Sequence, residues 1–133
     1  MKTLATLASA GALALGASTV AAAPTTVTLY KGTFVNSAKY TGSGTATVTK
    51  TGTTRTLRLA RNFRSDNRSI RLRMYLATDR TGRNFIDLGP MGKRGAHAFR
   101  IPARVRVGTY RYVIVWCAAV NEPITSAKLS LAR

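Results

Sequence analysis

The sequence predicts an all-β fold, an antiparallel β-sandwich or barrel-like sandwich preceded by a cleaved signal peptide. Three observations lead to this prediction. Short segments alternate between apolar and polar residues, glycines and prolines separate these segments at close spacing, and no stretch of ten or more residues after the signal shows helical periodicity. Chains made of many short strands joined by Gly- and Pro-containing turns form sandwiches or barrels.

The first 23 residues have the layout of a secretory signal peptide. Lys2 gives a short basic start, residues 4–20 are small and apolar, and three alanines at 21–23 offer a cleavage site. The run is short of the roughly 20 strongly apolar residues that a membrane anchor needs. We therefore expect one β domain over residues 24–133, with no transmembrane segment after cleavage. The protein should be secreted, periplasmic or associated with the cell envelope.

The first half of this domain contains three predicted strands. Residues 25–30 alternate in polarity, residues 45–50 are rich in threonine, and residues 54–60 place two leucines on one face. Gly52 lies in the turn between the second and third strands, where glycine tolerates the positive φ of a hairpin turn. The polar residues 61–68 then connect to the next strand.

Residues 69–77 show the clearest alternation in the chain. Four apolar side chains point one way and three others point the opposite way: Ile70, Leu72, Met74 and Leu76 against Arg71, Arg73 and Tyr75. This period of two predicts a half-buried strand, because a helix would scatter the arginines around its circumference. A short strand over 85–88, a Gly-rich loop over 89–95 and a strand over 96–101 follow.

Residues 110–120 are the most apolar segment of the domain. No residue from 112 to 120 is charged, and β-branched and aromatic side chains dominate, which suits a strand. Since neither face is polar, the segment is predicted to be a central strand covered on both sides. Residues 121–123 (Asn-Glu-Pro) should break it, and a last strand is expected over residues 126–132.

Cys117 lies in this central strand and is the only cysteine of the chain. One cysteine cannot form an internal disulfide, and it excludes tetrathiolate zinc sites, CxxC redox pairs and CxxCH haem attachment. Its apolar neighbours favour an inert buried side chain. Its place near the end of the strand, however, allows a reactive thiol at a rim, and a nearby arginine would favour the thiolate. Both interpretations stay open at this point.

The charge of the chain is strongly positive. Lys and Arg number 21 against four Asp and Glu, giving +17, and loss of Lys2 with the signal leaves +16. Such a charge attracts anionic polymers, including those of a cell envelope, although a generally basic proteome produces the same bias. Six arginines are the candidate polyanion-binding residues, three on the outer face of strands expected to be neighbours and three on the connection between them: Arg58, Arg71 and Arg73, with Arg61, Arg64 and Arg68.

The sequence gives little support for catalysis or for specific nucleic-acid recognition. His97 is the only histidine and lies in no nucleophile motif, and the four acidic residues stand apart at turns and strand ends. Neither paired catalytic carboxylates nor a metal site is therefore expected. The basic loop over 89–95 opens no helix, so it favours a phosphate loop only weakly. Arginines beside Tyr75 suit single-stranded nucleic acid, but no known binding motif is present. We do not expect the domain to be an enzyme by itself.

A series of short motifs runs in order through most of the domain. The most specific is Val113-Ile114-Val115-Trp116-Cys117. The others are Gly32-x-Phe34, Gly42-Ser43-Gly44-x-Ala46, Leu57-x-Leu59 with Asn62-Phe63, Met74-Tyr75-Leu76, Ile86-Asp87-Leu88-Gly89, Gly92-x-x-Gly95 before Phe99-x-Ile101-Pro102, and Ala127-x-Leu129. In this series the chain resembles the electron-transfer DM-thirteen domain, a small extracellular β domain. It departs from the family pattern at Asn62, at Arg68-Ser69, and at His97 and Phe99.

The resemblance implies a β-sandwich-like fold and a signature cysteine, here Cys117, that takes part in redox chemistry. It would act as a free thiol or as the ligand of a prosthetic group such as haem. Haem rests on the resemblance alone, since the sequence requires no cofactor. The resulting hypothesis is a secreted electron-transfer accessory domain that works with a redox partner protein. The alternative is a basic module that binds anionic envelope polymers, with Cys117 as an inert core residue.

Overall fold

The computed structural model describes residues 23–133, so the predicted signal peptide lies outside it except for its last residue. The described part consists of strands, turns and loops, and it has no helix of the length and apolarity needed to cross a membrane. The strands in chain order are β2 (Thr26–Asn36), β3 (Gly42–Ser43), β4 (Thr45–Thr51), β5 (Thr54–Leu59), β6 (Arg64–Ser65), β7 (Leu72–Ala77), β8 (Ile86–Met91), β9 (His97–Ile101), β10 (Tyr112–Cys117), β11 (Glu122–Lys128) and β12 (Ser130–Leu131).

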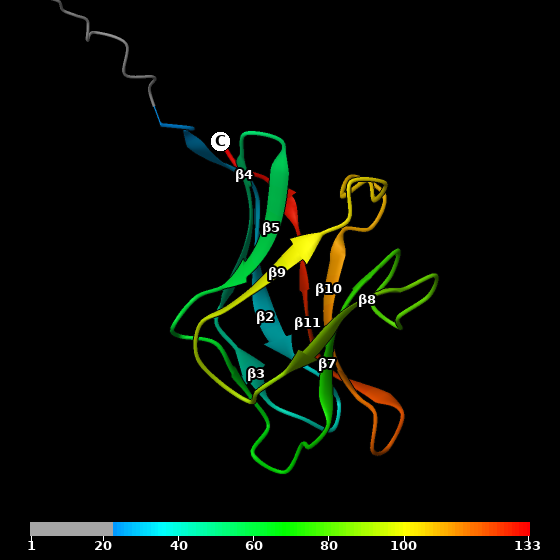
Figure 1. Cartoon of the computed structure of the whole chain (residues 1–133). Coiled ribbons are helices and arrows are strands. Elements are labelled where there is room, and N and C mark those ends of the chain that lie inside the picture. The colour runs from blue at the N-terminus through cyan, green and yellow to red at the C-terminus, as the bar shows by residue number, and fades with distance from the viewer. Residues whose placement is uncertain (1–22) are drawn as a thin grey trace, which may run out of the picture.

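These strands form one large antiparallel sheet that nearly closes on itself. Within residues 23–133 the sheet has nine strands in the order β8-β7-β10-β11-β2-β4-β5-β9, and β12 pairs with β2 outside this path. The edge strands β8 and β9 contact each other, which curls the sheet into a barrel-like body (Figure 1). Strands β3 and β6 form a separate small pair near one end of the body. The predicted all-β, antiparallel, barrel-like fold is confirmed.

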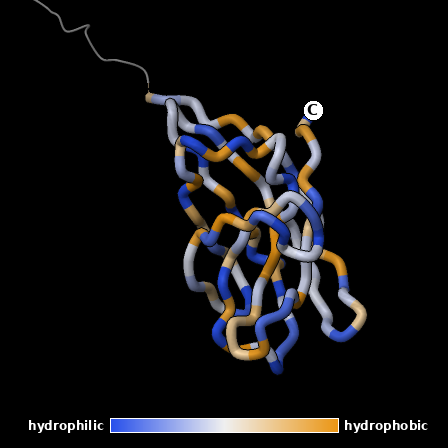
Figure 2. Tube along the Cα trace, turned by 90° about the vertical axis from the view of Figure 1, so that its right-hand side faces the viewer, coloured by the Kyte–Doolittle hydropathy of each residue, from blue (hydrophilic) through white to orange (hydrophobic). Residues whose placement is uncertain are grey.

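Strand β10 is covered on both faces, as its composition predicts. Val113 and Val115 point into the main core, whereas Ile114 points to the opposite face, and all three side chains are fully buried. Burying a side chain of this size contributes roughly 1.5–3 kcal/mol relative to exposing it. Apolar and polar residues alternate along much of the chain trace, which is the pattern of a barrel with one filled interior (Figure 2).

The outer face of β10 is covered by a small aromatic cluster. The Tyr75 ring stacks on Phe85 with 4.2 Å between ring centroids and on Trp116 with 5.3 Å. Tyr75 lies on the face opposite the core-facing residues of its strand, as the alternation predicts. It is nevertheless buried, because its aromatic neighbours cover it. Stacked aromatic pairs add about 0.5–1.5 kcal/mol beyond their buried area.

Several predicted boundaries differ from the structure. The first strand, predicted over residues 25–30, continues to Asn36, and the central strand, predicted over residues 110–120, spans only Tyr112–Cys117. The strand predicted from residue 69 begins only at Leu72, because Arg71 takes a left-handed backbone conformation with φ 54°. Strand β8 extends through Met91 into the predicted Gly-rich loop, because Gly89, Pro90 and Met91 pair with β7. The last strand begins earlier than predicted, at Glu122. The chain turns back at Asn121, which has φ 57°, so residues 121–123 do break the central strand.

Candidate functional site: the Cys117 pocket

Cys117 is the last residue of β10 and pairs with Leu72 of β7 and Glu122 of β11. The alternation along β10 directs its side chain inward, on the same side as Val113 and Val115. The residue is 2% exposed, and its thiol donates a hydrogen bond to the backbone carbonyl of Ile70 over 3.0 Å. The sulfur is therefore held at one end of the core rather than in the middle of it.

Two backbone hydrogen bonds fix the surroundings of the sulfur. The Ala118 N–H donates to the Arg71 carbonyl over 3.0 Å, which ties the segment before β7 to the end of β10. The Asn121 N–H donates to the Cys117 carbonyl over 2.8 Å and closes the turn that leads into β11. The left-handed conformation of Arg71 costs roughly 1–2 kcal/mol, whereas asparagine, as at position 121, adopts it more readily. These backbone bonds hold Ile70 beside the sulfur.

A pocket of about 290 Å³ lies against Cys117. The residues that line it are Tyr40, Arg68, Ser69, Ile70, Cys117, Ala119, Val120 and Ile124. Ile70 is 55% exposed and Val120 is 54% exposed, which places the mouth of the pocket at the protein surface. Cys117 thus forms part of the inner wall of an open pocket.

Ser69 adds a polar atom to this otherwise largely apolar wall. The residue is 3% exposed, and its buried hydroxyl has no hydrogen-bond partner within the described residues. A buried hydroxyl without a partner costs about 1–3 kcal/mol, and native proteins keep few such groups. A polar molecule in the pocket would offer this hydroxyl a partner.

The rim of the pocket carries a network of ion pairs. Arg68 holds Asp66 through two bonds, Nε to Oδ1 at 3.0 Å and Nη2 to Oδ2 at 3.2 Å, and its guanidinium carbon lies 5.8 Å from the centroid of the Tyr40 ring. The Tyr40 hydroxyl donates to Glu122 over 2.9 Å, and Lys39 pairs with the same carboxylate at 2.9 Å. The rim is therefore built from side chains that hold one another in place.

These contacts shift the acid–base properties of the rim. Hydrogen bonds from the Arg68 side chain, and then from the Arg68 and Thr41 backbone N–H groups, lower the pKa of Asp66 well below its ordinary value. Hydrogen bonds from Lys39 and Tyr40 lower the pKa of Glu122, and the same bond to Glu122 raises the pKa of Tyr40. Both carboxylates are thus charged at neutral pH. The charge of Arg68 is directed to Asp66, not toward the sulfur.

The pocket does not fit a haem bound through Cys117. Its volume of about 290 Å³ lies just below the roughly 300–1,000 Å³ typical of small-molecule and cofactor pockets, so it is too small to enclose a porphyrin. His97, a potential second axial ligand, does not line the pocket. Its Nε2 accepts from the Gly92 N–H over 3.0 Å, so Nδ1 carries the proton that bonds the Gly95 carbonyl at 2.9 Å. Both ring nitrogens are already engaged.

No His, Cys, Asp or Glu cluster of three or more, such as a metal ion requires, occurs in the part of the chain that the structure describes.

The six candidate arginines do not form the single face that the alternation suggests. Arg58 lies on β5 and Arg73 on β7, and these strands are not neighbours in the sheet, so that part of the prediction is wrong. Arg73 pairs with Asp87 at 2.7 Å, as Arg68 does with Asp66. Arg58, Arg61, Arg64 and Arg71 are exposed. Whether these residues bind a polyanion stays a prediction.

Sequence reasoning singled out Cys117 but missed Tyr40, Ser69 and Ile70 as its neighbours. Ile70 was predicted to point into the core, yet it lies at the mouth of the pocket. The left-handed residue that redirects it is an arginine, and arginine carries no sequence signal for that conformation. Glycine or asparagine at position 71 would have given such a signal.

Comparison with known proteins identifies the family of this domain. A family model described as Electron transfer DM13 matches residues 33–129, which includes β10 and Cys117. Comparison with curated proteins and with solved structures gave no significant match. The family match covers most of the chain and supports a general role related to electron transfer. The chain therefore belongs to the Electron transfer DM13 family.

Proposed function

We propose that this protein is an electron-transfer accessory domain outside the cytoplasm in which the Cys117 thiol is the redox group. The observation that carries the proposal is the position of Cys117 on the wall of a pocket that opens at the surface. The family match supports a role in electron transfer. As the only cysteine, Cys117 has no internal partner, so a disulfide at Cys117 requires a sulfur from another molecule.

The shape of the site favours a small oxidant. Cys117 is 2% exposed and is approached through a pocket of about 290 Å³, so a slender low-molecular-weight disulfide suits the site better than a folded protein surface. In the proposed step the Cys117 thiol first loses its proton to solvent, and the thiolate attacks one sulfur of that disulfide. A mixed disulfide forms, the original S–S bond breaks and a small thiolate leaves. Cys117 is oxidised, and the departing half is reduced.

The hydrogen bond between Cys117 and Ile70 governs when this step occurs. The thiolate is the nucleophile, so the proton shared with the Ile70 carbonyl must leave before attack. The return of the electrons follows the same route in reverse, when an external thiol or a redox partner protein attacks the mixed disulfide.

Mass spectrometry of the folded protein tests this function. The protein of residues 24–133 is incubated with hydroxyethyl disulfide in buffer without denaturant, and then with an excess of a small thiol. We expect one adduct, located on Cys117, that the thiol removes, and no adduct on Cys117→Ser. If the native protein stays unmodified while the denatured protein reacts fully, Cys117 is an inert core residue and the proposal is wrong.

Binding of anionic envelope polymers is the second candidate function. It is favoured by the excess of basic over acidic side chains. Each of the four acidic side chains already pairs with one basic side chain, in the pairs Lys39–Glu122, Arg68–Asp66, Arg73–Asp87 and Arg83–Asp79. The other basic side chains of the described residues are paired with none of these carboxylates, so their charges can attract an anionic polymer. Binding of this kind weakens steeply with salt, with a log–log slope that follows the number of phosphates neutralised. Binding that does not change between low and high salt would exclude it.

A further inference from the structure

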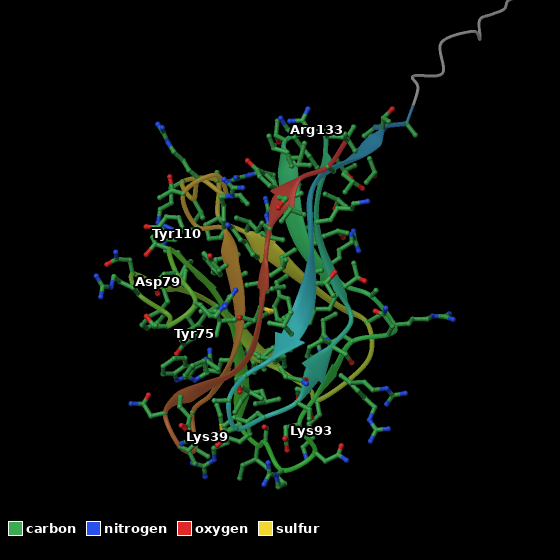
Figure 3. All side chains as sticks on the ribbon, turned by 180° about the vertical axis from the view of Figure 1, so that it is seen from behind. Lys39, Tyr75, Asp79, Lys93, Tyr110 and Arg133 are labelled. Atoms are coloured by element: carbon green, nitrogen blue, oxygen red, sulfur yellow. The ribbon has the colours of Figure 1, made fainter. Side chains whose placement is uncertain are left out.

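A second pocket, separate from the Cys117 pocket, lies where the β3–β6 pair meets residues 92–95. Its volume is about 340 Å³, and its lining includes Asn36, Arg64, Ser65, Asn67, Lys93 and Arg94. Lys93 lies at the same end of the barrel as Lys39, and Tyr110 and Arg133 lie at the other end (Figure 3).

The cations of this pocket are brought together by backbone pairing. Arg64 and Arg94 are directly opposite each other in an antiparallel β-bridge, and the Ser65 N–H donates to the Lys93 carbonyl over 2.7 Å. Like charges directly opposite on paired strands repel each other. An anion bound between Arg64 and Arg94 would attract both side chains and offset their mutual repulsion.

No carboxylate lines the pocket to balance these cations. Asp66 follows Ser65 in the chain, but its oxygens accept from Arg68 at 3.0 Å and from the Thr41 N–H at 3.2 Å. The other three acidic residues pair with Lys39, Arg73 and Arg83. The surplus of positive charge in the pocket is thus not compensated by any Asp or Glu of the chain.

Ser65 is an independent indication that something binds here. The residue is 7% exposed, and its buried hydroxyl has no hydrogen-bond partner in the described part of the chain. It lines the same pocket as the three cations. A buried hydroxyl in this state is destabilising, and a ligand oxygen would accept its proton.

Two further side chains of the pocket, Asn36 and Lys93, can also donate hydrogen bonds. The Asn36 side-chain oxygen accepts from the Gly42 N–H over 3.0 Å, which leaves the Asn36 amide nitrogen as a donor. Lys93 donates to the Asn67 carbonyl over 2.7 Å, and an ammonium has two further protons to give. The pocket therefore offers several hydrogen-bond donors, and the two guanidinium groups can each form paired bonds with one anion. Such a set suits an oxyanion and above all a phosphate group.

We propose that the Arg64–Ser65–Lys93–Arg94 pocket is a binding site for a phosphate group, either inorganic phosphate or the phosphate of a small organic ester. The pocket volume of about 340 Å³ leaves room for an organic substituent beside the phosphate. The site differs from diffuse attraction of anions by the charged surface, since it includes a buried neutral hydroxyl and two arginines whose backbones are paired. It does not depend on the chemistry of Cys117.

An NMR titration at constant low ionic strength tests the site, with inorganic phosphate in one arm and glycerol phosphate in the other. Three variants accompany the wild-type domain. Arg64→Gln/Arg94→Gln removes the paired arginines, Ser65→Ala removes the hydroxyl without a charge change, and Arg104→Gln/Arg106→Gln removes the same charge from exposed positions outside the pocket. Thermal melting of each variant checks that it folds.

We expect saturable shifts of the amides of residues 42–43, 64–67 and 92–95. Loss of the paired arginines should weaken binding about tenfold or more, and Ser65→Ala about threefold or more, because each removes direct bonds to a charged ligand. Ser65→Ala should melt at the same temperature as the wild type or higher, since it also removes an unpartnered buried hydroxyl. Tighter binding of glycerol phosphate, read from the titration midpoint, would support an organic ester as the ligand, and tighter binding of inorganic phosphate would support the free ion.

Two results would overturn the proposal. One is equal weakening by the pocket pair and by the Arg104/Arg106 pair, which would mean attraction by net charge alone. The other is an absence of saturable shifts in these three segments with either phosphate compound.

Discussion

The Cys117 thiol donates a hydrogen bond to the Ile70 carbonyl over 3.0 Å, at the point where the barrel core meets an open pocket. This contact joins the end of β10 to the segment before β7. It therefore couples the only sulfhydryl of the domain to the position of a pocket wall. A cysteine that served only as apolar filler would form no such hydrogen bond. The two interpretations therefore predict different stabilities for variants of Cys117.

Cys117→Ser should be better tolerated than Cys117→Val. The serine hydroxyl can still donate to Ile70, at a cost of about 1 kcal/mol, whereas valine leaves the carbonyl without a partner and adds a methyl group, at about 2–3 kcal/mol. Urea unfolding of the two variants at neutral pH measures the difference. A valine variant as stable as the serine variant would show that the site behaves as ordinary apolar filler.

Val120→Trp should slow the reaction of Cys117 with a small disulfide by roughly tenfold or more, because the reagent must reach the thiolate through the pocket. Val120 is 54% exposed at the mouth, so a larger side chain there need not disturb the core. Val27→Trp is the matched control, since Val27 is 51% exposed on β2 and does not line the pocket. Rates are followed by release of a chromophoric thiolate. Equal rates for the two variants would show that the pocket is not the route.

Asp66 should make the domain sensitive to acid. Its pKa is lowered in the folded state, mainly by the Arg68 side chain, so its contribution is complete above the unfolded pKa of about 3.9 and is lost as pH falls below that value. Asp66→Asn lacks this titration. The melting temperature of the wild type should exceed that of the variant at pH 7, and the gap should narrow toward pH 2. A gap that is constant with pH would contradict this assignment.

Gly44→Ala should destabilise the fold more than Gly52→Ala. Gly44 has φ 107°, and an added Cβ would lie 2.5 Å from the Phe63 Cα, so we expect a loss of about 2–3 kcal/mol. Gly52 has φ 61° and open space around it, so only the conformational cost of about 1 kcal/mol remains. Denaturant midpoints of both variants provide the comparison. A smaller loss at Gly44 would place the β3–β4 turn outside the packed body.

The strands were predictable where the burial of each face of the strand determines the pattern of apolar and polar residues. Val113, Ile114 and Val115 are apolar without alternation because both faces of β10 are covered. This pattern is visible in the sequence of the segment alone. The signature around Cys117 likewise carried the family assignment, which the match over residues 33–129 confirms.

The candidate sites were less predictable, because they depend on contacts between distant segments. The sequence predicts that Arg58 and Arg73 share a face because their strands follow closely along the chain, but the strand order places β5 and β7 apart. Ser65 meets Lys93 only through the pairing of β6 with the segment after β8. The basic Gly-rich segment over residues 89–95 opens no helix, so its sequence favours a phosphate loop only weakly. Periodicity within one segment contains no information about such pairings.

The most direct test of the account is the rate at which Cys117 reacts with a small disulfide reagent across low denaturant concentrations. The unfolding rate is measured in the same buffers. If the pocket gives access to the folded state, the reaction rate should be nearly independent of denaturant below the transition and much faster than global unfolding. A rate that rises steeply with denaturant and never exceeds the unfolding rate would contradict the account, since the sulfur would then react only after the barrel opens.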